Sequence, residues 1–140
     1  MKSTASLFYL FAVLFALAGM AWGIQMSATH DHSLSPAHGH LNLLGFVAMA
    51  VFGTFYALSP EAGRSRLAKF HLGLAVLSVV LLVPGIVMAI TGSGETLAKI
   101  GSVLTLLSMA MFGFVVLKFG VGTATRDGFA AERVMSHPAE

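Results

Sequence analysis

The sequence predicts an all-α membrane protein, a bundle of four transmembrane helices in up-down-up-down order. Of its 140 residues, 56% are hydrophobic and only 10% are charged, whereas about 25% of the residues in a typical soluble domain are charged. Four windows reach the roughly twenty apolar residues that a membrane span needs, and none of them contains Lys, Arg, Asp or Glu. The segments between these windows are short, so consecutive helices are expected to be antiparallel neighbours.

The expected spans follow directly from these windows. In chain order they cover residues 7–26, 41–58, 72–90 and 100–117. Together they form one transmembrane domain over residues 1–119. Pro84-Gly85 inside the third span predicts a kink toward its outer half. Residues 120–140 show little periodicity and are expected to form a cytoplasmic tail that is partly disordered.

The first span has two possible interpretations. Lys2 followed by an apolar stretch has the outline of a cleaved signal peptide. The apolar stretch is longer than the core of a typical signal peptide, however, and it carries small residues at helical spacing, which suit close packing in lipid. These are Ala12, Ala16, Gly19 and Gly23. A retained helix is therefore the expectation.

The second and fourth spans each gather polar and small residues on one face. In the second span, helical steps from His38 reach Asn42, Gly45, Met49, Gly53 and Tyr56. In the fourth span, the stripe consists of Gly101, Thr105, Ser108 and Phe112. Because an amide in lipid needs a partner, the face that carries Asn42 is expected to pack against protein. The hydroxyls of the fourth span are expected to bond to carbonyls one turn earlier or across to Asn42.

The basic residues are distributed unevenly. The amino-terminal end, the second loop and the tail hold seven of the eight Lys and Arg, whereas the first and third loops hold only Lys99. This bias predicts that both termini are cytoplasmic and that the first loop, residues 27–40, lies on the outer face. The net charge is only +2 and no long basic run is present, so nucleic-acid binding is not expected.

Four of the six histidines lie between residues 30 and 40, at the predicted outer end of the bundle. They are His30, His32, His38 and His40. Neutral imidazole is a good ligand for zinc, copper and haem iron, so this cluster is a candidate metal site. The alternative is a solvated polar loop without a ligand. His71 lies beside Lys69 at the opposite edge and is interpreted as an interfacial anchor.

The sequence offers few other residues that could catalyse a reaction or bind a cofactor. There is no Cys, which excludes thiolate ligands, disulfides and covalent haem attachment through a Cys-x-x-Cys-His motif. No nucleophile-base pair, carboxylate dyad or phosphate-binding loop is visible, and no acidic or basic residue falls within a span. A self-contained enzyme is therefore not expected.

Residues 38–61 carry a more specific pattern. The stretch His38-Gly-His40-Leu-Asn42-Leu-Leu-Gly-Phe, continued by Phe-Gly, a Tyr and Pro60-Glu61, resembles the second helix of the haem-copper oxidase subunit I family, closest to its nitric oxide reductase branch. The resemblance implies that His40 is an axial ligand of haem b near the outer face, with Asn42 beside it. His38 is extra to the motif.

The resemblance also limits the expected activity. This chain has the size of one four-helix arc of the family's catalytic subunit and lacks the histidines that lie on its later helices. The implied role is therefore electron transfer or sensing of haem or redox state, rather than oxygen reduction by this chain alone. Met49 lies about 13 Å along the helix from His40 and cannot be the opposite ligand of the same iron. A second axial ligand would come from another subunit, including His40 of a second copy.

Two other functions remain open. The four outer histidines could hold copper or zinc for metal delivery or oxidase assembly. Alternatively, the chain is a cofactor-free structural subunit of a respiratory complex. The expected partners are the lipid bilayer and either further copies of the chain or respiratory-complex subunits. The expected location is the bacterial inner membrane.

Overall fold

The computed structural model describes residues 2–122, and this part of the chain contains helices and no strands. The helices are α1 (Thr4–Thr29), α2 (Ser35–His40), η1 (Leu41–Ala48), α3 (Met49–Leu58), α4 (Pro60–Arg64), α5 (Arg66–Ile90) and α6 (Thr96–Phe119). The π-helix η1 joins α2 to α3, so that Ser35–Leu58 forms one continuous helical segment. We call this segment the second span. The tail expected at residues 120–140 lies largely outside the described residues.

Four helices are long and apolar enough to cross a membrane: α1, the second span, α5 and α6. Their number is as predicted, and each extends beyond its predicted window at one end or both. Ser3 caps the start of α1 and Ser65 caps the start of α5, since each side chain accepts a hydrogen bond from a first-turn backbone N–H. The predicted α-helix from residue 41 to 58 is wrong in one respect, because its first eight residues are π-helical.

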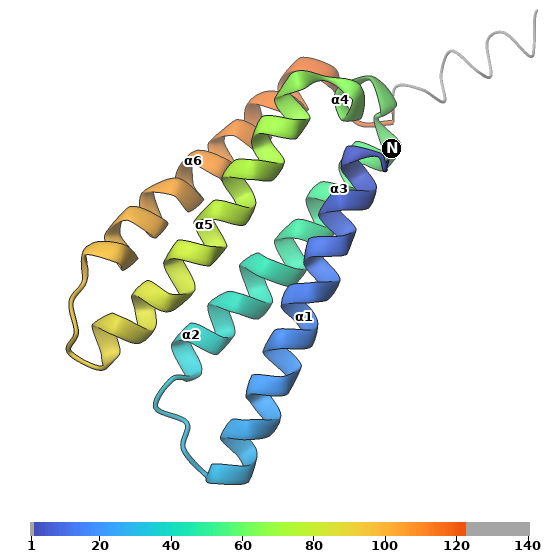
Figure 1. Cartoon of the computed structure of the whole chain (residues 1–140). Helices are drawn as coiled ribbons and strands as arrows, with labels where there is room; N and C mark the ends of the chain where they lie inside the picture. The colour runs from blue at the N-terminus through green and yellow to red at the C-terminus, as the bar shows by residue number, and fades with distance from the viewer. Residues whose placement is uncertain (1, 123–140) are drawn as a thin grey trace, which may run out of the picture.

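The helices form an elongated bundle, in which α1 lies beside the second span and α5 lies beside α6 (Figure 1). The beginning of α1, the short helix α4 and the end of α6 gather at one end of the bundle. We call this the α4 end. Residues 30–34 and 91–95 form loops at the opposite end, which we call the loop end. Ser59 ties α4 to the end of α6, because its hydroxyl donates to the Gly120 carbonyl at 3.2 Å.

Small residues allow α1 and the second span to approach closely. A Cβ on Gly19 would collide with the Asn42 side chain, and a Cβ on Gly45 would lie 2.8 Å from Phe15 Cβ. The small residues expected on the packed face of α1 are buried at Ala12, Ala16 and Gly19. The predicted packing of the Asn42 face against protein is thus confirmed.

Glycines also allow α5 and α6 to approach closely. A Cβ on Gly101 would lie 2.5 Å from Leu82 Cα, and a Cβ on Gly85 would collide with the backbone of Ala98. Helix α5 continues through Pro84 to Ile90. Gly85 therefore lies where the backbones of α5 and α6 approach closely, whereas Pro84 is exposed.

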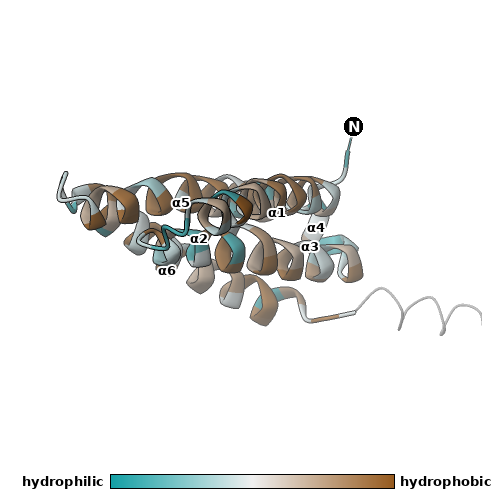
Figure 2. Cartoon of the chain, turned by 90° about the horizontal axis from the view of Figure 1, so that it is seen from below, coloured by the Kyte–Doolittle hydropathy of each residue, from teal (hydrophilic) through white to brown (hydrophobic). Residues whose placement is uncertain are grey.

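The outer surface of the bundle is apolar. Hydrophobic colouring predominates along the helices in Figure 2. Large apolar side chains are exposed on every long helix, among them Ile24, Val51, Leu77, Leu106 and Leu117. Soluble proteins rarely expose so much apolar surface, whereas this surface suits contact with lipid.

Candidate functional site

His40 ends α2, and its side chain is exposed near the loop end. Its Nδ1 lies 2.7 Å from the carbonyl oxygen of Pro36, one turn earlier. Because a carbonyl oxygen only accepts hydrogen bonds, Nδ1 is the donor and carries the proton. In the neutral ring Nε2 then holds a lone pair. Metal-bound histidines are commonly oriented in this way, with one ring nitrogen donating to a backbone carbonyl and the other facing the metal.

The π-helix η1 begins at Leu41, directly after His40. Segments of π-helix are rare and are often found at functional sites. Asn42 lies in this first turn, and its amide donates to the backbone carbonyl of His38 at 3.0 Å and contacts the His38 ring at 3.2 Å. The expected bond between Asn42 and a hydroxyl of the fourth span is therefore not formed. Thr105 instead donates to the Gly101 carbonyl at 2.9 Å, which was the other predicted partner. The prediction is wrong for Ser108, because its buried hydroxyl has no hydrogen-bond partner among the described residues.

His38 faces a different part of the structure from His40. Its ring lies edge-on to Trp22 on α1, with ring centroids 6.2 Å apart. A Cβ on Gly23 would lie 3.2 Å from His38 Cε1, so this glycine makes room for the ring. His38 and Asn42 line a groove between α1 and the second span. The two rings of the His38-x-His40 pair thus point to different surroundings.

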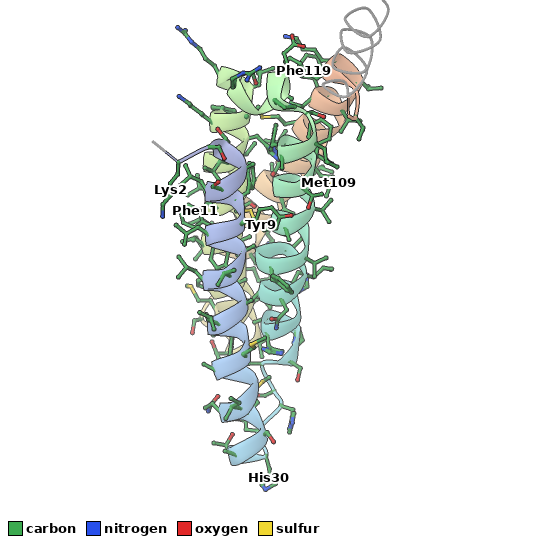
Figure 3. All side chains as sticks on the ribbon, turned by 90° about the vertical axis from the view of Figure 1, so that its right-hand side faces the viewer. Lys2, Tyr9, Phe11, His30, Met109 and Phe119 are labelled. Carbon is green, nitrogen blue, oxygen red and sulfur yellow. The ribbon has the colours of Figure 1, made fainter. Side chains whose placement is uncertain are left out.

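The other two candidate ligands lie further along the loop end. His30 follows α1 in a left-handed backbone conformation, with φ 55°, and lies at the tip of the bundle (Figure 3). His32 is exposed in the loop. Within residues 2–122, no three His, Asp or Glu side chains lie close enough together to hold a metal ion. The described structure therefore does not bring His30, His32, His38 and His40 into one ligand set.

A second polar site lies inside the bundle, and sequence analysis missed it. His71 is fully buried, and its Nδ1 lies 2.9 Å from the hydroxyl of Tyr56. The ring is enclosed by aromatic rings of three other helices, Phe8 at 5.4 Å, Phe52 at 4.6 Å and Phe112 at 5.8 Å between centroids. Its Nε2 has no hydrogen-bond partner among the described residues.

The interpretation of His71 as an interfacial anchor is therefore wrong. Helix α5 already begins at Arg66, so His71 lies more than one turn inside it and on the face that meets α1, α3 and α6. A sequence signal for this was present in the spacing of Phe52 and Tyr56, which are one helical turn apart and can enclose one partner. The buried position favours a structural role for the Tyr56–His71 pair.

Comparison of the chain with family models, curated proteins and solved structures finds no match. The likeness to haem-copper oxidase subunit I therefore rests on residues 38–61 alone.

Proposed function

We propose that this chain is a multi-pass membrane protein that binds haem b through His40 and serves electron transfer or sensing of haem or redox state. In this proposal the four helices cross the bacterial inner membrane in up-down-up-down order, with both termini cytoplasmic and the loop end outside. The apolar outer surface and the seven-to-one distribution of Lys and Arg support this placement. The chain is not proposed to be a self-contained enzyme.

The observation that carries the haem proposal is the orientation of the His40 ring. The bond from Nδ1 to Pro36 holds the ring and leaves the Nε2 lone pair on an exposed surface. Leu43 and Val47 of the adjoining η1 are exposed, so apolar surface follows His40 along the second span and is available for a porphyrin. The residues present thus fit one axial ligand and its surroundings. When bound, haem b supplies reversible one-electron chemistry, which the protein tunes through its ligands.

The position of the second ligand favours an oligomer. Met49 is 1% exposed in the core and is therefore not available on the surface that carries His40. His38 is packed against Trp22 on the other side of the helix. In a two-fold symmetric dimer, His40 of a second copy would be the other residue that holds the haem iron, and no new residue would be needed.

Optical spectra of the detergent-purified protein, oxidised and dithionite-reduced, test this function. The natural chain, produced with haem available, is expected to show the sharp bands of low-spin haem b. His40→Ala should abolish them, whereas His32→Ala, which removes an exposed histidine of the preceding loop, should not. Far-ultraviolet circular dichroism and gel filtration check that each variant is folded. Haem bands that survive in His40→Ala would refute the assignment.

The same preparations separate the other two functions. Colourless protein with stoichiometric copper or zinc that disappears when His30 and His32 are both replaced would indicate metal delivery or oxidase assembly. Colourless, metal-free protein that co-purifies with a respiratory enzyme would indicate a structural subunit. Either result would replace the haem proposal.

A further inference from the structure

A cavity of about 700 Å³ opens at the α4 end of the bundle, away from the histidine-rich loop. Three basic residues line it: Lys2 precedes α1, Arg64 ends α4, and Lys69 lies in the first turn of α5. Figure 3 shows Lys2 at the end of the bundle opposite His30. The fold thus brings together cations from three segments that are separate in the sequence.

The charged side chains in the described lining of this cavity are all basic. No acidic side chain is among the described residues that line it. Glu61 lies on α4 but outside the lining, and the one ion pair between described residues, Lys99 with Glu95, lies at the loop end. Three neighbouring cations raise the local positive potential, which favours a ligand that carries negative charge.

The rest of the lining suits an amphiphilic ligand. Ser3 and Ser6 add hydroxyl groups near the basic residues, whereas Ala5, Ala57 and the ring of Tyr9 form apolar wall. Tyr9 is partly exposed and continues into the exposed apolar surface of α1 at Leu10. A free inorganic anion would use the charges and leave this apolar wall wet. A phospholipid would use both parts.

We propose that this cavity binds the headgroup of an anionic phospholipid, with Lys2, Arg64 and Lys69 around its phosphate and its acyl chains along the apolar surface of α1. Basic pockets between helices at the cytoplasmic face commonly recognise such headgroups. The inference rests on the proposed membrane insertion and on the cytoplasmic placement of the α4 end. It does not depend on haem.

Native mass spectrometry of the purified full-length chain, with added phosphatidylglycerol or phosphatidylcholine, tests the proposal. The natural chain is expected to bind phosphatidylglycerol at least about tenfold more tightly than phosphatidylcholine. Replacing both Arg64 and Lys69 by Gln should weaken this binding about 25-fold, because each surface cation contributes roughly fivefold to the attraction of anionic lipid. The matched control replaces Arg66 and Lys118, two cations at the same end outside the cavity, by Gln and should leave binding within about twofold.

Three variants and one competing ligand further test the lipid site. Lys2→Gln, which changes a residue that precedes α1, should weaken phosphatidylglycerol binding without disturbing a helix. Equal loss in the Arg66/Lys118 control would show a general effect of surface charge and overturn the proposal. Displacement of the lipid by millimolar inorganic phosphate would assign the cavity to a free anion and also overturn it. His40→Ala should bind phosphatidylglycerol as tightly as the natural chain, so failure of the haem proposal can be distinguished from failure of the lipid proposal.

Discussion

The hydrogen bond between Tyr56 and His71 connects α3 to α5 and allows a quantitative test of the packing. Tyr56 is 2% and His71 0% exposed, so water does not reach the bond. Tyr56→Phe keeps the aromatic ring and removes the partner of Nδ1. Hydrogen bonds between membrane helices contribute about 0.6 kcal/mol on average and up to about 1.7 kcal/mol, and a stranded buried polar group costs about 1–3 kcal/mol. We expect the variant to lose about 1–2 kcal/mol of its free energy of unfolding.

Tyr9→Phe is the matched control for this variant. The Tyr9 hydroxyl also bonds to a side chain, Thr54 at 2.5 Å, but Tyr9 is 43% exposed. Its loss is expected to cost less than about 0.5 kcal/mol, as is usual for exposed positions. The two variants remove the same atom and differ in burial.

A double-mutant cycle isolates the pair. His71→Leu alone leaves the Tyr56 hydroxyl buried without its partner, whereas Tyr56→Phe combined with His71→Leu removes both polar groups. Replacing both partners by apolar groups can be nearly neutral, so the double variant should be less destabilised than the sum of the single variants. The expected coupling is at least about 0.5 kcal/mol.

Unfolding by SDS in mixed micelles, followed by circular dichroism, measures these free energies. Fluorescence of Trp22, the single tryptophan of the chain, reports separately on α1. If Tyr56→Phe costs no more than Tyr9→Phe, or if the effects in the cycle are additive, the buried pair does not exist as described.

Two further predictions concern the second helix pair and the loop that joins it. Gly101→Ala should destabilise the protein by about 1–3 kcal/mol, because the added Cβ would lie 2.5 Å from Leu82 Cα. The control, Gly113→Ala, adds a Cβ on the same helix with no described atom within 4 Å and should stabilise the protein by up to about 1 kcal/mol. Equal effects of the two variants in the SDS titration would contradict this packing. The Lys99 ammonium, 2.9 Å from Glu95, lowers the pKa of that carboxyl below its ordinary 4.5. The small stabilisation is therefore present above pH 4.5 and is lost as the pH falls through the lowered pKa. Lys99→Ala should raise the pKa of Glu95 toward 4.5 in an NMR titration, and an unchanged pKa would rule out the pair.

The sequence predicted the packed face of the second span well. Helical periodicity relates His38, Asn42, Gly45 and Met49 by local geometry alone, and the need to partner an amide in lipid indicates which way the face turns. The same reasoning found the small residues of α1 that pack against this face. It did not find η1, since π-helical turns have no simple periodicity signal.

By itself, the sequence determined the four candidate spans and the packed faces of the first and second. Hydrophobic length and helical repeat are properties of contiguous residues, so the tertiary structure was not needed to find them. Only the tertiary structure decided that His71 is enclosed by rings from α1, α3 and α6, and that Lys2, Arg64 and Lys69 line one cavity. The physical reason is that the rotation and depth of each helix are set by contacts between residues far apart in the chain, and no single helix encodes them.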